Sequence, residues 1–309
     1  MSVVLPSAVI ETCATQIANL ASRHEHSRPI VGVFDSGVGG LTVLPALHAP
    51  TQIFDSQYLG DTAHFPYGEK TEAELVPLVL ADIAHLVTAG CSLVGIACNT
   101  ASIVWNELLT QLPEPVQRQA KTVVLDTIST TMQALAQVER RQTIGIIGTS
   151  FTVQSGAYRH AIERQFPHAR PVILQSAEQS LVNAIEHDDP DAIKQELERI
   201  MHFFSAHDLD VFILGCTHYG HIAQAIKSAL PPHVVMLDPS VLLGQALRSL
   251  ALAHISPRSF PSTSTTLPSA AGSAALLAPA SGSMPPTAPA PQYQSVITFT
   301  GATPTTSVY

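Results

Sequence analysis

The sequence contains few charged residues, few aromatic residues and few cysteines. Charged side chains make up 13% of the 309 residues, aromatic side chains make up 6%, and four positions are cysteine. Four cysteines are too few for a disulfide scaffold, so a reducing compartment is the default. The N-terminal segment lacks the basic start of a secretion signal and carries Glu11 early. The sequence therefore predicts a cytoplasmic protein with free thiols.

A basic charge balance and a long apolar run are also missing. Acidic residues outnumber basic ones by 24 to 15, which gives a net charge of −9. Proteins that bind a phosphate backbone carry a basic surface, so a general nucleic-acid partner is excluded. No run reaches about 18 uninterrupted apolar residues, so no membrane span is expected. Hydrophobic residues make up 46% of the chain, which is ample for a buried core, and the length suits about two domains.

Short apolar runs alternate with helix-like stretches along most of the chain. Continuous apolar runs are typical of strands covered on both faces, and strand–helix alternation indicates a parallel sheet with helices on both sides. The predicted class is therefore α/β. Predicted strands cover 30–34, 53–60, 92–98, 122–126, 143–148, 170–175, 210–216 and 234–238. Predicted helices cover about 71–89, 101–112, 127–139, 154–166, 177–187, 190–206, 219–230 and 239–254.

The two ends of the chain differ in composition from the body. Residues 1–28 precede the first predicted strand and are interpreted as an N-terminal extension. The stretch 256–292 consists mainly of Ser, Thr, Ala and Pro, which predicts a low-complexity flexible insert. β-Branched and aromatic character returns at Val296–Phe299, where we expect an edge strand.

A faint internal repeat divides the body into two halves. GVFDSG (32–37) resembles GIIGTS (145–150), and LVGIACNTAS (93–102) resembles VFILGCTHYG (211–220). In each half, a strand that ends in a turn with a hydroxyl group is followed by a strand that ends in cysteine and polar residues. Two similar α/β halves would place the two cysteines on opposite walls of one cleft.

Polar motifs follow the predicted strands, where open α/β sheets bind ligands. The glycines of FDSGVGG (34–40) allow positive φ and close backbone approach, and free amides there suit a carboxylate or phosphate. The spacing differs from a dinucleotide fingerprint, and a helix-capping turn is the other interpretation. The loop GDTAHFPYGEKT (60–71), with Asp61, His64 and Tyr67, is either a polar-ligand loop or an ordinary turn.

Two of the four cysteines lie in matching strand-end contexts. Cys98 and Cys216 each precede polar residues at the start of a predicted helix, where the pKa of a thiol is lowered, whereas Cys13 and Cys91 are interpreted as core residues. A C-x-x-C redox motif is absent, and no third ligand completes a zinc site. A single cysteine nucleophile paired with histidine is possible but leaves one thiol unused. Inversion of a stereocentre uses both thiols, because one removes a proton from one face and the other returns a proton to the opposite face.

Taken together, these segments resemble glutamate racemase, a cofactor-independent enzyme of bacterial cell-wall synthesis. The matching segments are IVGVFDSGVGGLTVL (30–44), YLGDTAHFPYGEKT (58–71), GIACNTAS (95–102), TIGIIGTSFTVQSGAY (143–158) and DVFILGCTHYG (210–220). The resemblance implies two pseudo-symmetric domains, each a mostly parallel sheet flanked by helices, with the active site in the cleft between them. We expect the first domain to span 29–123, 232–255 and 293–309, and the second to span 124–231.

The resemblance also implies roles for individual residues. Cys98 and Cys216 match the catalytic cysteines; Asp35 would assist the first, and His218 and Glu186 the second. The implied substrate-binding residues are Asp35, Ser36, Tyr67, Gly68, Asn99, Thr100, Thr149, Thr217 and His218.

The chain departs from the family at three places. Glu178-Gln179 replaces the usual Cys-Pro, which leaves the match at Glu186 uncertain; His64 stands where arginine is common, and LDTISTT (125–131) replaces a glutamate-proline segment.

The resemblance implies that the ligands are D- and L-glutamate, that no cofactor or metal is needed, and that the enzyme is a homodimer which supplies D-glutamate for peptidoglycan. An aspartate or hydantoin-type racemase and a non-catalytic amino-acid-binding regulator are the alternatives. A turnover assay would separate the enzyme from the regulator.

Overall fold

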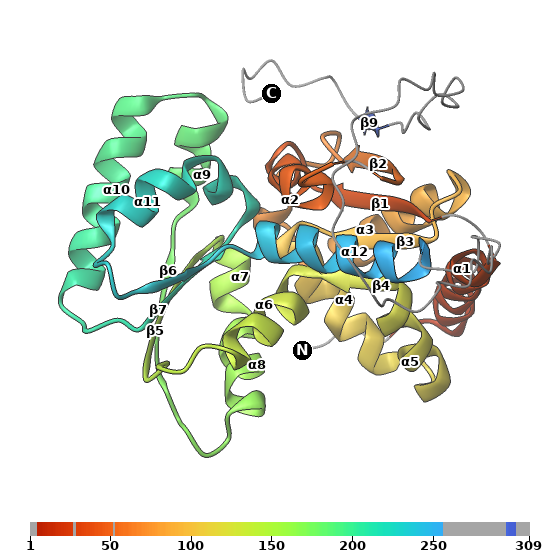
Figure 1. The fold of residues 1–309 in the computed structure, drawn as a ribbon, viewed down its shortest axis with the longest axis horizontal. Helices are drawn as coiled ribbons and strands as arrows, with labels where there is room; N and C mark the ends of the chain where they lie inside the picture. The colour runs from red at the N-terminus through yellow and green to blue at the C-terminus, as the bar shows by residue number, and fades with distance from the viewer. Residues whose placement is uncertain (1–4, 27–28, 52, 256–294, 301–309) are drawn as a thin grey trace, which may run out of the picture.

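The computed structural model describes residues 5–26, 29–51, 53–255 and 295–300, which form two parallel β-sheets flanked by helices (Figure 1). The first sheet has the order β4-β3-β1-β2-β9, with β1 (Ile30–Asp35), β2 (Asp55–Gly60), β3 (Leu93–Ile96), β4 (Val124–Asp126) and β9 (Ser295–Phe299). The second has the order β6-β5-β7-β8, with β5 (Thr143–Gly148), β6 (Val172–Ala177), β7 (Val211–Gly215) and β8 (Val235–Leu237). Every strand pair is parallel, as the continuous apolar runs predict.

The two sheets share one topology, which accounts for the internal repeat. Read in chain order, β1, β2, β3 and β4 of the first sheet occupy the same relative places as β5, β6, β7 and β8 of the second. β9 pairs with β2 at the edge of the first sheet, as expected for Val296–Phe299. The predicted domain limits differ from this pairing: β4 pairs with β3 in the first sheet, and β8 pairs with β7 in the second. The chain therefore crosses between halves after Asp126 and after Leu237, a few residues later than the sequence indicates at each crossing.

Helices cover both faces of each sheet, and each interface is apolar. In the first half, α1 (Ser7–His26), α3 (Glu72–Thr88), α4 (Asn99–Gln111) and α5 (Glu114–Val123) share one core, while α2 (Leu44–His48) and α12 (Pro239–Ile255) supply the other. In the second half, α6 (Thr127–Ala136) and α8 (Ala157–Gln165) cover one face, and α9 (Gln179–Glu186), α10 (Pro190–Ser205) and α11 (Ala223–Ala229) cover the other. The short α7 (Ser150–Gln154) follows β5.

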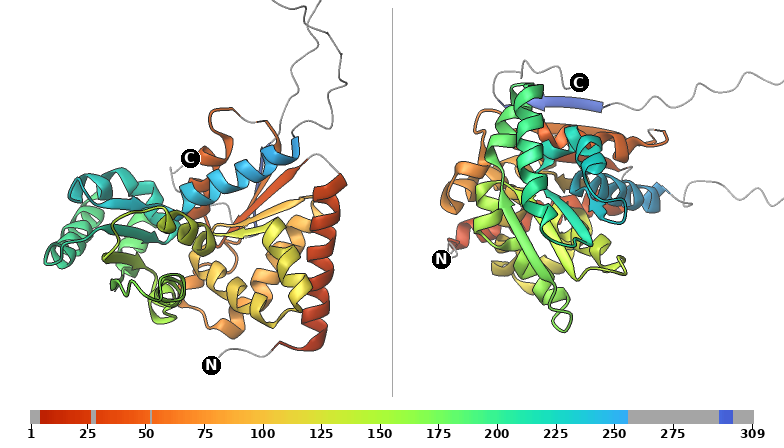
Figure 2. Two further views of the ribbon diagram at one scale, coloured as in Figure 1. Left: turned by 60° about the horizontal axis from the view of Figure 1, so that its bottom comes forward. Right: turned by 90° about the vertical axis from the view of Figure 1, so that its left-hand side faces the viewer.

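Among the described helices of at least eight residues, α1 and α5 were not predicted from the sequence. Residues 7–26, within the expected extension, form α1, which lies beside α5 (Figure 2) and buries Ile17 and Leu20 completely. α5 occupies the start of the predicted strand 122–126, because Val123 packs into the core as the last residue of the helix. Local β-branched character at this position is thus overridden by packing. The insert 256–292 lies outside the described residues.

Helix α12 joins the second half back to the first. A methyl group on Gly95 would lie 2.5 Å from Leu247 Cδ1, and one on Gly244 would lie 2.6 Å from the Val43 carbonyl oxygen, so glycine permits close contact at both positions. α12 also contacts α6, so it packs against helices associated with both sheets. Within the described residues, none of the helices is both long and apolar enough to cross a membrane.

Candidate active site

The carboxyl ends of the central strands of both sheets meet at one small cavity of about 20 Å³. This cavity, called the catalytic cavity from here on, is lined by ten of the twelve residues that the sequence singled out; the other two, Asp35 and Glu186, do not line it. Its lining consists of Ser36, Phe65, Pro66, Tyr67, Gly68, Cys98, Asn99, Thr100, Thr149, Gln179, Val182, Cys216, Thr217 and His218. Both candidate cysteines therefore face the same small space.

Cys98 is the residue before helix α4 and is 6% exposed. Its Sγ lies 3.7 Å from Ser36 Oγ. The sequence predicts a lowered pKa at this helix N-terminus, but that prediction is wrong for the structure as described: burial and then the charge of Asp35 raise the pKa of Cys98 to about 12. The backbone hydrogen bond from Ala101 opposes this rise and is too weak to offset it. Cys98 is therefore a protonated thiol in the closed cavity.

Cys216 occupies the equivalent position after β7 and has a histidine partner. His218 Nδ1 lies 3.6 Å from Cys216 Sγ, and its Nε2 is hydrogen-bonded to Glu186 Oε1. Burial alone would lower the pKa of His218, but the hydrogen bonds to Cys216 and Glu186 raise it well above its ordinary value. A protonated imidazole held in this way donates a hydrogen bond to each of its two partners. Glu186 therefore contacts His218, the other residue that the resemblance assigned to the support of the second cysteine.

Asp35 connects the two halves from beneath the catalytic cavity. Its carboxylate accepts hydrogen bonds from the Gly37 amide at 2.9 Å and from the Thr217 hydroxyl at 3.0 Å. Burial raises the pKa of Asp35, whereas the charge of His218 and these hydrogen bonds lower it. The sequence predicted free backbone amides for a ligand in this turn. The Gly37 amide is not one of them, because it donates its hydrogen bond to Asp35.

The glycines of the FDSGVGG segment are needed for close approach and not for positive φ. A methyl group on Gly39 would lie 2.5 Å from Thr217 Oγ1 and 2.8 Å from His218 Nδ1. Among the described glycines, only Gly90 and Gly156 have positive φ. The first half thus presses its turn directly against the loop that carries the second cysteine.

Asn99 presents an unused donor to the catalytic cavity. Its Oδ1 accepts hydrogen bonds from the Tyr158 hydroxyl at 2.6 Å and from Thr127 Oγ1 at 3.2 Å. Its Nδ2 is buried and has no hydrogen-bond partner among the described residues. Nearby, the hydroxyls of Thr100 and Thr149 lie 3.4 Å apart and join the two halves. An orphaned donor beside hydroxyl groups is suited to a carboxylate ligand.

Several residues of the site were not found from the sequence. The side chains of Phe65, Gln179 and Val182 line the catalytic cavity, and Tyr158 orients Asn99. The altered dipeptide Glu178-Gln179 was the only signal for Gln179. Tyr67 and Gly68 line the cavity as expected, but the Tyr67 hydroxyl is bonded to Asp61 and Asp82 on the side away from the thiols. His64 is half exposed and binds Asp61.

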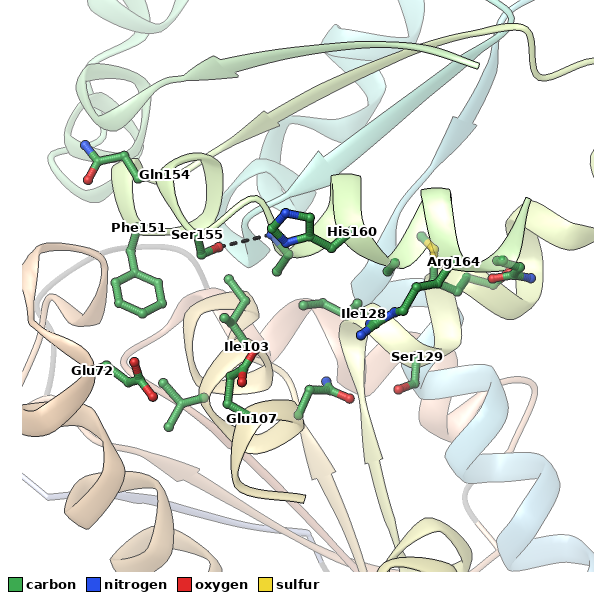
Figure 3. Close-up of a pocket in the computed structure, with 16 residues that line it drawn as sticks. Glu72, Ile103, Glu107, Ile128, Ser129, Phe151, Gln154, Ser155, His160 and Arg164 are labelled. Atoms are coloured by element: carbon green, nitrogen blue, oxygen red, sulfur yellow. Dashed lines mark hydrogen bonds between the residues drawn. The ribbon is translucent and has the colours of Figure 1, made fainter. Parts of the chain in front are cut away.

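A larger cavity of about 770 Å³ lies between helices α4, α6, α7 and α8 (Figure 3). Glu72 and Glu107 stand on one side of it, and His160 and Arg164 stand on the other. Cys98 and Cys216 do not line this larger cavity and share only the smaller one. No group of three or more potential metal-ligating side chains occurs in the part of the chain that the structure describes.

Comparison with known proteins points to one group of enzymes. The profile of the Asp/Glu/Hydantoin racemase family matches residues 46–246. A glutamate racemase from Picosynechococcus sp. is 34% identical over 211 residues, which is 68% of this chain and 72% of that protein. Among solved structures, glutamate racemase isoform RacE1 from Bacillus anthracis has a TM-score of 0.63 and 27% identity over 75% of this chain and 84% of that one. The glutamate racemase from Francisella tularensis in complex with D-glutamate has a TM-score of 0.61 and 29% identity over 74% and 82%.

Proposed function

Since the chain belongs to the Asp/Glu/Hydantoin racemase family, we propose that it interconverts L- and D-glutamate without a cofactor, using Cys98 and Cys216 as the two acid–base groups. The observation that carries this proposal is the pair of thiols on one cavity, each at the end of an equivalent strand of the two sheets. Inversion of a stereocentre requires groups on opposite faces of the α-carbon. A pseudo-symmetric site supplies two such groups of the same kind.

The different surroundings of the two thiols suit one direction of the reaction. His218, whose pKa is raised well above its ordinary value, lies against Cys216 and would assist this cysteine as the base, whereas burial raises the pKa of Cys98 and keeps its thiol protonated. Cys216 would take the α-proton of L-glutamate, and the Cys98 thiol would give its proton to the opposite face, which yields D-glutamate. The enzyme is left with a Cys98 thiolate and a Cys216 thiol, and this state performs the reverse reaction on D-glutamate.

The bound amino acid would bring a positive charge, its ammonium group, close to Asp35 and Cys98. Its ammonium group would reduce the repulsion between Asp35 and a Cys98 thiolate, which is one of the causes of the raised Cys98 pKa. Asn99 Nδ2 and the hydroxyls of Thr100 and Thr149 would hold carboxylate oxygens. Preorganised donors of this kind stabilise the carbanion-like state that forms when no electron sink is present.

Entry of glutamate requires the two halves to separate. A space of about 20 Å³ holds about one water molecule, which is far less than an amino acid needs. The Asp35–Thr217 hydrogen bond and the Thr100–Thr149 contact span the halves and would have to open. Closure then excludes water and brings both thiols to the substrate.

The resemblance extends the proposal to the cell. We propose a cytoplasmic homodimer whose D-glutamate is used in peptidoglycan synthesis. The family assignment and the sequence composition support this proposal.

The deciding experiment is circular dichroism of D- or L-glutamate incubated with enzyme that has been treated with chelator and freed of pyridoxal phosphate. We expect loss of optical activity from either enantiomer, with slower turnover of aspartate. Cys91→Ser is the matched control, because Cys91 is buried in the first core and does not line the catalytic cavity. Dependence on metal or pyridoxal phosphate, or faster turnover of aspartate, would contradict the proposal.

A further inference from the structure

Behind the catalytic cavity, one phenol hydroxyl lies between two buried carboxyl groups. The Tyr67 hydroxyl is 2.6 Å from Asp61 Oδ2 and 2.9 Å from Asp82 Oδ2. The three residues are 1%, 2% and 5% exposed, in the order Tyr67, Asp61, Asp82. They come from the short helical turn at Tyr67–Glu69, the loop after β2, and the middle of α3. The side chains of this cluster are therefore almost entirely buried.

Two hydrogen bonds join the three groups of the cluster, and each needs a proton. If both carboxyl groups are ionised, the Tyr67 hydroxyl supplies the only proton. A phenol has a single proton and can donate it to one carboxylate only. The shorter distance, to Asp61, is typical of a hydroxyl that donates to a charged oxygen. The second contact is then a hydrogen bond only if the Asp82 carboxyl carries a proton and donates it to the Tyr67 oxygen.

The other partners of the two carboxyl groups agree with this assignment. Asp61 also accepts from His64 Nδ1 at 2.9 Å and from the Thr300 hydroxyl, so donors surround it. The only hydrogen bond that the described residues make to the Asp82 carboxyl is the one to Tyr67. The negative charge therefore resides on Asp61 and the proton on Asp82.

Charged and titratable groups reach Asp82 from each neighbouring element. Asp61 and His64 lie in the loop after β2, and Tyr67 follows them in the chain. His85 lies one turn further along α3. Asp61, His64, Asp82 and His85 line another cavity of about 180 Å³. Asp35 acts from the end of β1. Burial first, and then the charge of Asp61, raise the pKa of Asp82 to about 8.

The cluster controls a wall of the catalytic cavity. Residues 65–68 line that cavity, and Tyr67 is the member of this loop that is anchored to α3. The centroids of the Phe65 and His218 rings lie 5.9 Å apart. A methyl group on Gly68 would lie 2.9 Å from Thr149 Cβ, so the loop also touches the second half. A shift of Tyr67 would therefore change two contacts of the loop: that of Phe65 with His218 beside the second thiol, and that of Gly68 with Thr149 in the second half.

We propose that Asp82 is a positioning residue that acts as a neutral carboxylic acid, whose proton holds Tyr67 and thereby keeps the loop of residues 65–68 closed on the catalytic cavity. When Asp82 ionises, two carboxylates face one hydroxyl, and one of the two hydrogen bonds is lost. The kinetic part of this proposal rests on the proposed racemase activity, whereas the protonation of Asp82 does not.

The first test measures protonation directly by infrared spectroscopy of the full chain. We expect a protonated-carboxyl band in wild type at pH 6.5 that disappears as the pH rises through about 8 and is absent from Asp82→Asn at both ends of the range. Tyr67→Phe, which removes the acceptor of that proton, should shift the same band. A wild-type spectrum with no band titrating in this window overturns the proposal, even if the protein has no racemase activity or Asp82→Asn does not fold.

The second test compares pH profiles of kcat/KM for glutamate. The amide of Asp82→Asn can donate to Tyr67 as the acid does, so we expect neutral activity within about threefold of wild type and loss of the decline near pH 8. Asp238→Asn is the control, because burial also raises the pKa of Asp238 but this residue lies at the start of α12, away from the cavity. An unchanged alkaline decline in Asp82→Asn would show that Asp82 does not position the loop.

Discussion

The pairing of Glu186 with His218 offers the sharpest quantitative test of the second half of the site. Glu186→Gln keeps the size of the side chain and one hydrogen-bonding oxygen but removes the charge. The hydrogen bond and the charge of Glu186 are among the causes that raise the pKa of His218. Without them, His218 is protonated for less of the time and gives less support to a Cys216 thiolate.

The expected loss follows from the strength of a charge-assisted hydrogen bond. Such bonds contribute about 1.5–3 kcal/mol, and the Glu186 side chain is only 20% exposed, so solvent screening is modest. If this contribution is lost from the transition state, kcat/KM falls by about 10- to 150-fold. Because mirror-image glutamates are equal in free energy, the fall in kcat/KM must be the same in both directions. Only kcat and KM taken separately can differ between L- and D-glutamate.

The assay is steady-state racemisation from each enantiomer, followed by circular dichroism. Glu198→Gln is a matched control, since Glu198 lies on α10 in the same half of the protein and is exposed to solvent. We expect the control to keep wild-type kinetics. Wild-type kcat/KM in Glu186→Gln, with His218 intact, would refute the reasoning that this carboxylate supports the thiol through the imidazole.

Three further predictions address the thiols, the cleft and the pH dependence of stability. Cys98→Ser and Cys216→Ser should each lower kcat by about 10²- to 10⁴-fold, because a hydroxyl is a much weaker base; full racemisation by either variant would exclude the two-base scheme. Gly68→Ala places a methyl group 2.9 Å from Thr149 Cβ, so closure should carry about 1–3 kcal/mol of strain and kcat/KM should fall by about 5- to 150-fold; unchanged kinetics would show that the halves do not close this tightly. The pKa of Asp82, raised to about 8, makes the folded state retain a proton that the unfolded chain releases near pH 4, so stability from this residue is complete below pH 4 and is lost as pH rises to about 8. Between pH 6 and 7.5, urea unfolding of wild type should therefore lose about 1.4 kcal/mol per pH unit more than Asp82→Asn, and equal slopes would contradict the assignment.

The sequence by itself determined the class of the fold and the place of the two thiols. Buried parallel strands are continuous apolar runs, so β1, β5 and β7 could be located from the pattern of apolar residues along the chain. The residue that follows such a strand must lie at the ligand-binding edge of the sheet, which places Cys98 and Cys216 there by local chain geometry. The internal repeat then predicted two similar halves, because a repeated order of elements repeats the topology.

Properties that depend on distant segments came only from the tertiary structure. Helix α5 replaced part of a predicted strand because Val123 meets a core that local propensity does not describe. The pairing of Glu186 with His218 joins α9 to the turn after β7, across 32 positions of the chain. The pKa of Cys98 rises because burial and Asp35 outweigh the favourable helix terminus. Desolvation is set by everything that surrounds a group, so its size cannot be read from neighbouring letters in the sequence.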